Sequence, residues 1–319
     1  MGILDVFRGL RPSGRSRRDG AAAAAAADEG LFDEEFQRRL EYLAMVSRRV
    51  FNGVMKAERR TKKTGSGVEF ADHRNYTPGD DFRYLDWHAY RRFDRLLVRL
   101  FEEEEDLSIY FIVDNSTSMG FRDREKLRHA KRLTAALAYV GLANLDRVAI
   151  VAANAEINGR MEPTRSKGRI FRVFRFLERV APDGTTDLEG ALKTFVAQHK
   201  RRGLAVVLSD LYDPAGFERG INVLRYNKFE PFVLHVVSAA DRAPTLKGDL
   251  VLYDCETGQE REVTVTKRIL DKYAMAYDDY LRRVERFCAT RQVSYFRADI
   301  DVPFDELILR VFRRGGFLR

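Results

Sequence analysis

Cysteine, tryptophan and long apolar runs are scarce in this 319-residue sequence. The scarcity of cysteine and of long apolar runs limits the classes of protein to which it can belong. The only cysteines are Cys255 and Cys288, which is too few for a disulfide framework and typical of a reducing compartment. No apolar run reaches the roughly 18 residues that a membrane-spanning helix needs. The N-terminal residues, MGILDVFRGLRPSGRSRRDG, lack the apolar core of a signal peptide. We therefore expect a cytoplasmic protein without a transmembrane segment.

Common catalytic signatures are missing as well. The sequence contains no glycine-rich loop ending in GK[ST], no GxSxG elbow and no HExxH pair. These patterns mark nucleotide-hydrolysing P-loops, acyl-transfer serines and zinc proteases. The prediction is a protein that is not an enzyme.

Charge alone does not identify a partner. The formal net charge is +8, from 56 Lys and Arg against 48 Asp and Glu. This excess permits binding to nucleic acid or to an anionic membrane surface. The basic residues are interleaved with acidic ones, however, and the strongest cluster spans only residues 59–63. Binding to nucleic acid or to an anionic surface is therefore an alternative and not the main prediction.

Two hydrophobic periodicities alternate from residue 107 onward. Short β-branched or aromatic runs predict buried strands, and amphipathic segments predict helices. The expected strands are 107–113, 147–153, 157–161, 204–209, 231–237 and 293–297. The expected helices are 123–145, 170–180, 188–199, 214–227, 268–291 and 304–313. Residues 250–266 are expected to form a β-hairpin or a short meander, with Gly258 at its turn. This alternation predicts an α/β domain with a mostly parallel sheet and helices on both faces.

The residues before this domain divide into two further parts. Residues 1–30 contain clustered arginines and seven consecutive alanines, which is typical of a disordered tail. Its first ten residues include an apolar stretch that could touch a membrane or a partner. From Leu31 to about Gly53, apolar residues recur every three or four positions and predict a helix. We expect a tail over 1–30, a helical and β extension over 31–106, and the α/β domain over 107–319.

A segment of unusual composition lies within the extension. Residues 65–99 alternate acids and arginines among aromatic residues, around the turn signal Pro78-Gly79-Asp80-Asp81. This pattern predicts a buried or half-buried network of ion pairs. His73 and His88 lie among carboxylates, but their spacing fits no standard set of metal ligands. Two interpretations of the part from Tyr76 to Trp87 stay open: packing against the sheet, or a surface for a partner.

The most informative stretch follows the first strand of the predicted domain. Asp114, Ser116 and Ser118 place a carboxylate and two hydroxyls at alternate positions. Oxygen ligands suit hard cations such as Mg²⁺, Mn²⁺ or Ca²⁺. Ligands of open α/β sheets bind beyond the C-terminal ends of the strands, and Thr186 and Asp210 are expected near that same edge. Alternatively, Asp114 and Ser116 could simply cap backbone N–H groups near a helix start.

These motifs resemble two known families. The DxSxS loop, the Gly-Thr-Thr loop and the later strand-end aspartate resemble the metal-ion-dependent adhesion site of von Willebrand factor A domains. The matching residues are Asp114, Ser116, Ser118, Thr186 and Asp210. GTTDLEGAL resembles that family's GGTDL pattern, which favours Thr186 over Thr185. Upstream, EFADHRNYTPGDDFRYLDW followed by LLVRLFEEEE resembles the signature of the bacterial domain-of-unknown-function family DUF58.

The resemblance implies a chemistry and a class of partner. The two serines and the threonine would bind Mg²⁺, or Mn²⁺ or Ca²⁺, directly or nearly so, and the two aspartates largely through water. Neutral hydroxyls do not neutralise the charge of the cation, so an acidic side chain of a partner protein could complete its coordination. Proteins of this kind also work beside MoxR-type AAA ATPases in chaperone-like assembly or activation. The resemblance thus implies a metal-dependent protein-interaction module.

A metal-dependent phosphatase is the enzymatic alternative. An aspartate at a strand end is also the nucleophile position of haloacid-dehalogenase-type phosphatases. Those enzymes need a second carboxylate two residues later as a general acid, and Ser116 stands there. A hydroxyl cannot supply that acid chemistry at neutral pH, so the sequence favours the interaction module.

Overall fold

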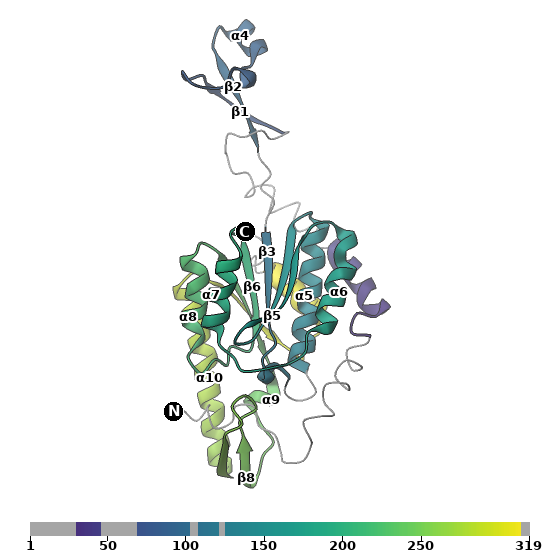
Figure 1. Cartoon of the computed structure of the whole chain (residues 1–319), viewed down its shortest axis with the longest axis vertical. Coiled ribbons are helices and arrows are strands. Elements are labelled where there is room, and N and C mark those ends of the chain that lie inside the picture. Colours follow the sequence, from purple (N-terminus) through teal and green to yellow (C-terminus); the bar gives the residue numbers. More distant parts are fainter. Residues whose placement is uncertain (1–29, 46–68, 103–107, 121–124, 314–319) are drawn as a thin grey trace. The chain divides into compact units, whose positions relative to one another are not determined.

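The computed structural model describes residues 30–45, 69–102, 108–120 and 125–313, which form two compact units (Figure 1). The first unit contains residues 30–45 together with 108–120 and 125–313, and the second contains residues 69–102. We expected 31–106 to be one extension, but residues 31–45 belong to the unit that contains the sheet. The predicted tail before Gly30, and the predicted helix beyond residue 45, lie outside the described residues.

A six-stranded sheet is the centre of the first unit. Its strands are β3 (Ser108–Asp114), β4 (Arg147–Ala153), β5 (Ile157–Thr164), β6 (Leu204–Ser209), β7 (Glu230–Val237) and β10 (Ser294–Asp299). They lie in the order β10-β7-β6-β3-β4-β5, and every neighbouring pair is parallel except β4 and β5. The predicted α/β class with a mostly parallel sheet is confirmed. The strand order reverses between β3 and β6, which makes that pair the switch point where such sheets bind ligands.

The central strands are buried on both faces. Every residue of β3 (SIYFIVD) and of β6 (LAVVLS) is buried. Continuous runs of this kind are typical of parallel strands covered by helices on both sides. A polar side chain at the end of such a strand is thus held in a fixed and largely dry position.

Helices cover both faces of the sheet (Figure 1). One face carries α5 (Glu125–Ala143), α6 (Ile170–Arg179) and α11 (Phe304–Arg313), with α5 contacting β3, β4, α6 and α11. The other face carries α7 (Leu188–Gln198), α8 (Phe217–Tyr226) and α10 (Lys267–Thr290), whose apolar side chains share one core with the strands. Short helical segments are η2 (Thr117–Gly120), η3 (Lys167–Arg169) and α9 (Ala239–Arg242). No helix in the described ranges has both the length and the apolar character needed to cross a bilayer.

Aromatic packing explains why residues 31–45 belong to the first unit. Residues 34–45 are helical, and Phe32 stacks on Phe174 of α6 with ring centroids 4.6 Å apart. Phe36 lies 4.7 Å from the ring of Phe304 at the start of α11. Each such pair contributes about 0.5–1.5 kcal/mol beyond the burial of its area. The apolar face of this segment therefore covers α6 and α11.

The predicted β-hairpin is present between β7 and α10. It consists of β8 (Gly248–Tyr253) and β9 (Glu260–Val265), which pair antiparallel. Gly258 lies in the connecting turn with a φ of 71°, a conformation that glycine adopts without steric cost. This small sheet is separate from the six-stranded one.

The second unit is a small α and β module. It contains β1 (Glu69–Asn75), η1 (Phe82–Tyr84), α4 (Trp87–Phe93) and β2 (Leu97–Glu102), with β1 and β2 antiparallel.

The predicted buried or half-buried network of ion pairs is found only in part: two pairs of this module are half-buried, whereas the pair of Arg83 and Asp81 is exposed. Arg74 donates two hydrogen bonds to Asp80, at 2.8 and 2.6 Å, and His73 Nε2 lies 2.9 Å from Asp86. Hydrogen bonds from the backbone of Ala89 and from His73 lower the pKa of Asp86 to about 2. These pairs hold β1 against the turn and against the start of α4.

Candidate metal centre

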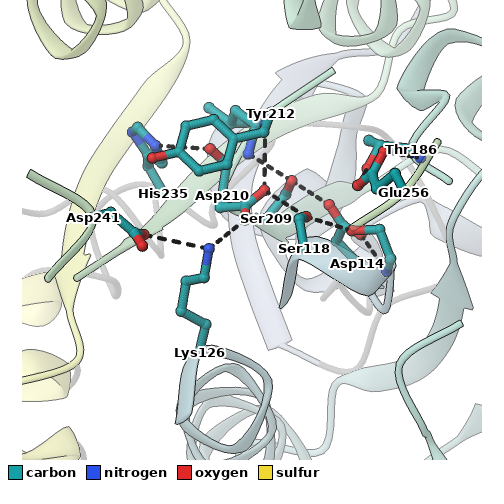
Figure 2. Close-up of polar contacts among 12 residues, drawn as sticks. Asp114, Ser118, Lys126, Thr186, Ser209, Asp210, Tyr212, His235, Asp241 and Glu256 are labelled. Atoms are coloured by element: carbon teal, nitrogen blue, oxygen red, sulfur yellow. Dashed lines mark hydrogen bonds and ion pairs between the residues drawn. The ribbon is translucent and has the colours of Figure 1, made fainter. Parts of the chain in front are cut away.

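Asp114 joins the ends of β3 and β6 at the switch point. Its side chain is 2% exposed. One carboxylate oxygen accepts a hydrogen bond from Ser209 Oγ at the end of β6, and the other accepts one from the backbone N–H of Ser116 at 2.9 Å. Figure 2 shows Ser209 lying between Asp114 and the neighbouring Asp210. The carboxylate is therefore fixed from both strands.

A chain of hydroxyls links Asp114's loop to Asp210. The Oγ atoms of Ser116 and Ser118 lie 2.9 Å apart, and Ser118 Oγ lies 3.4 Å from Asp210 Oδ1. Ser116, Ser118 and Asp210 are all buried. The structure thus brings four of the five predicted residues into one continuous polar network.

Thr186, the fifth predicted residue, lies in the adjoining loop. That loop is tied to the Asp114 loop because the N–H and hydroxyl of Thr117 both donate to the carbonyl of Gly184, at 3.1 and 2.8 Å. Thr186 is buried, whereas Thr185 is exposed. The backbone N–H and the hydroxyl of Thr186 both donate to the carboxylate of Glu256, at 3.0 and 2.8 Å. Burial therefore favours Thr186 over Thr185 as the residue that faces the site.

Lys126 is a charged member of the network that the sequence did not reveal. It lies in the first turn of α5, and its Nζ is 2.7 Å from Asp210 and 3.3 Å from Asp241 (Figure 2). Burial alone would lower the pKa of Lys126, but the charges of Asp210 and Asp241 outweigh it and raise the pKa. The lysine is therefore a permanent cation on the side of Asp210 that faces α9.

His235 holds the backbone of Asp210. Its Nε2 is 3.1 Å from the carbonyl of Asp210, and its Nδ1 is 3.1 Å from the hydroxyl of Tyr295. Burial lowers the pKa of His235 to about 4, so the ring is neutral at pH 7. A neutral ring that donates from Nε2 to the carbonyl and accepts the tyrosine hydroxyl at Nδ1 satisfies both contacts.

The electrostatics of the site leave room for more positive charge. Burial, with the nearby charge of Asp210, raises the pKa of Asp114 well above that of an ordinary aspartate. Lys126 already forms ion pairs with both Asp210 and Asp241. A divalent cation beside Asp114 would stabilise its ionised form.

The donor set fits a small hard cation held by hydroxyls. All five predicted side chains offer oxygen, which Mg²⁺, Mn²⁺ and Ca²⁺ prefer. Neighbouring ligands of an octahedral Mg²⁺ at 2.0–2.1 Å are about 2.9 Å from each other, which matches the separation of the Ser116 and Ser118 oxygens. Asn115 lies between Asp114 and Ser116 in the same loop. Its buried Oδ1 has no hydrogen-bond partner among the described residues. Nowhere in the described ranges do three His, Cys, Asp or Glu side chains gather to hold a metal, so this site would depend on its hydroxyls.

The fold and the residues at the C-terminal ends of β3 and β6 define an α/β protein with a polar site at the switch point of a mostly parallel sheet. Residues 72–282, about two thirds of the chain, match the family described as "Protein of unknown function DUF58". The chain belongs to this family, as the signature between Glu69 and Trp87 predicted.

Relatives and similar structures are also known. An uncharacterized protein of Mycobacterium tuberculosis is 26% identical over 294 residues, covering 90% of this chain and 92% of that protein. An uncharacterized protein of Mycobacterium avium is 33% identical over 142 residues, covering 43% of this chain and 83% of the relative.

Two solved structures are similar at low identity. The conserved hypothetical protein BatB from Bacteroides thetaiotaomicron has a TM-score of 0.39, with 13% identity over 66% of this chain and 97% of that chain. The vWF domain of the type V pili tip protein Mfa5 from Porphyromonas gingivalis has a TM-score of 0.26, with 18% identity over 32% and 36% of the two chains. Neither likeness supports a conclusion about function.

Proposed function

We propose that this chain is a divalent-metal-dependent protein-interaction module without catalytic activity of its own. Asp114, Ser116, Ser118, Thr186 and Asp210 would hold Mg²⁺ or Mn²⁺, and an acidic side chain of a partner protein would complete the site. The class of partner that the family resemblance suggests is a MoxR-type AAA ATPase, with the chain acting in assembly or activation of other proteins.

One observation supports this proposal above the others. Ser116 and Ser118 direct their hydroxyls at each other, between two buried carboxylates at the switch point of the sheet. Neutral ligands leave a bound cation with most of its charge and therefore with a strong preference for another anionic oxygen. Such a site is suited to capturing a carboxylate from another molecule.

The same geometry gives little support to a phosphatase. The position two residues after Asp114 is Ser116, which is fully buried and hydrogen-bonded to Ser118. A general acid at that position would need a group that exchanges protons near neutral pH. An interaction module needs no such group.

The first test is the response of the melting temperature to metal. Bound at a hundred times its dissociation constant, Mg²⁺ or Mn²⁺ stabilises the folded state by about 2.7 kcal/mol. For a unit of this size we expect a rise of about 5–10 °C in Tm. Asp114→Asn keeps the shape of the side chain and removes its charge, so this variant should lose the rise.

Asp183→Asn is the matched control, because Asp183 is an exposed carboxylate next to the same edge. It should respond to metal as the wild type does. An equal rise in wild type and Asp114→Asn would contradict a metal site at Asp114.

The partner can be tested by capture from a lysate with and without EDTA. Capture of a MoxR-type AAA ATPase by the wild type in Mg²⁺, and its loss with EDTA or Asp114→Asn, would support the proposed partner. Recovery of nucleic acid that is insensitive to EDTA and weakens with salt would instead favour the basic residues as the binding surface.

A further inference from the structure

The turn of the β8–β9 hairpin presents an acidic residue of the chain itself to the candidate metal centre. Glu256 lies in this turn, and its two carboxylate oxygens accept hydrogen bonds from the N–H and the hydroxyl of Thr186. The two residues are 70 positions apart in the sequence. Figure 2 shows Thr186 and Glu256 together beside the Asp114 end of the network.

An apolar cluster anchors the hairpin that carries this turn. Leu252 and Val265 are buried in one cluster with Tyr273 and Tyr277 of α10 and with Val237 at the end of β7. The hydroxyl of Tyr273 donates to the carbonyl of Asp241 at 2.7 Å, which ties α10 to α9. The hairpin is therefore packed on the same edge of the sheet that carries Asp114 and Asp210.

The turn itself is closed by its own hydrogen bonds. Asp254 Oδ1 accepts the N–H groups of Glu256 and Thr257, at 2.8 and 3.0 Å. The N–H of Asp254 donates to the carbonyl of Gln259 at 2.9 Å. The side chain of Glu256 therefore projects from a preorganised turn, and this lowers the entropy cost of placing its carboxylate.

The contact with Thr186 leaves both partners able to bind a cation. A threonine hydroxyl has one hydrogen to donate and two lone pairs to offer, and each carboxylate oxygen can accept more than one bond. The hydroxyl of Thr186 can donate to Glu256 and still present a lone pair to a metal. Each Glu256 oxygen likewise keeps the capacity for a further bond.

We propose that Glu256 is the anionic ligand of the metal in the isolated chain, occupying the place that an acidic residue of the partner takes on binding. This inference rests on the proposed function, because it assumes a cation at the Asp114 site. It makes the β8–β9 hairpin a built-in competitor: a partner binds by displacing Glu256. Affinity for a partner's carboxylate is then set by how firmly this turn is held.

The test is a calorimetric titration of Mn²⁺ into the wild type and into Glu256→Gln. Glutamine keeps an oxygen that can accept from Thr186 but loses the charge, and affinity of oxygen sites depends on the ligand charge. We expect the Mn²⁺ affinity of Glu256→Gln to fall about tenfold, the lower end of the range found when groups that support a metal are removed. Glu260→Gln, at an exposed glutamate of the same hairpin, is the matched control and should bind as the wild type does.

Acetate supplies a second readout that a merely structural role of Glu256 would not move. Free acetate should restore much of the Mn²⁺ affinity of Glu256→Gln and should have little effect on the wild type. Unchanged Mn²⁺ affinity in Glu256→Gln, with binding lost in Asp114→Asn, would overturn the role of Glu256 and leave the metal site standing. A wild type that binds no Mn²⁺ would overturn both.

Discussion

At the scale of single residues, the choice between Thr185 and Thr186 decides the composition of the site. The two residues are adjacent, but only Thr186 is buried and bonded to Glu256. Thr185 is exposed, so its hydroxyl lies outside the buried polar network. The hydroxyl at Thr186 is therefore the one that the proposal requires.

This requirement can be tested with a series of variants at the two positions. Thr186→Ala should weaken Mn²⁺ binding by about 10–100-fold, the range found when groups that support a metal are removed. Thr186→Ser keeps the hydroxyl and should retain most of the affinity. Thr185→Ala is the neighbouring control and should bind normally in the same titration. Weakened binding in Thr185→Ala with normal binding in Thr186→Ala would assign the role to Thr185 instead.

Residue patterns indicated the oxygen-bearing side chains at the strand ends but not the charged group that pairs with them. Asp114, Ser116, Ser118 and Asp210 could be predicted because parallel strands end at one edge of the sheet. Lys126 could not, because a lysine in the first turn of an amphipathic helix looks like an ordinary solvated residue. Its burial follows from the position of α5 against Asp210 and Asp241, which only the tertiary structure defines.

At the scale of elements, α5 carries a half-buried histidine whose protonation opposes folding. The Nε2 of His129 is buried without a hydrogen-bond partner among the described residues. It lies in a pocket with Phe36, Arg132 and Phe304, where residues 34–45 and α11 meet α5. Burial, with a smaller contribution from the charge of Arg132, lowers the pKa of His129 to about 4, against the opposing effect of Asp301.

A pKa that is lower in the folded state makes stability depend on pH in a defined direction. An unfolded histidine has a pKa of about 6.5, so between pH 6.5 and pH 4 the unfolded state binds more protons. Stability from this group is therefore complete above pH 6.5 and is lost as pH falls toward 4, by about 2 kcal/mol between pH 7 and pH 5. His129→Gln should remove this part of the pH dependence.

Urea denaturation in EDTA at pH 7 and pH 5 would measure the effect. The free energy of unfolding of the wild type should fall more between the two pH values than that of His129→Gln. The titrating or charged neighbours of this pocket are Asp33, Glu35, Arg39, Arg132 and Asp301. They are unchanged in the variant, so the difference isolates the histidine. Equal losses in the two proteins would show that His129 does not charge in this range.

Elements with strong periodicity were predictable, but their partners were not. The helix beginning after Leu31 was expected from its spacing, yet its place against α6 and α11 depends on Phe174 and Phe304 far along the chain. The β8–β9 hairpin was likewise expected from its turn at Gly258. Its position over the switch point depends on the packing of Leu252 and Val265 on α10, which no local pattern records. Glu256 was missed for this reason.

At the scale of the whole molecule, the two units differ in what stabilises each of them. The candidate metal centre is built wholly from residues of the first unit. The single tryptophan of the chain, Trp87, lies in α4 of the second unit, where its side chain is 55% exposed. The second unit is held by its own ion pairs between β1, the turn and α4. Trp87 is therefore a reporter of the unit that does not carry the metal centre.

This division predicts that metal will act on one unfolding transition and not on the other. Because a ligand stabilises only the folded unit that binds it, Mg²⁺ or Mn²⁺ should shift the transition followed by far-ultraviolet circular dichroism, which the helices and strands of the first unit dominate. The transition followed by selectively excited tryptophan fluorescence should stay at the same urea concentration. Trp87→Phe, which removes the fluorescent reporter, should leave the metal-dependent shift of the circular dichroism transition intact. Equal shifts in both signals would mean that the two units unfold as one cooperative structure, and a partner that displaces Glu256 could then act on both.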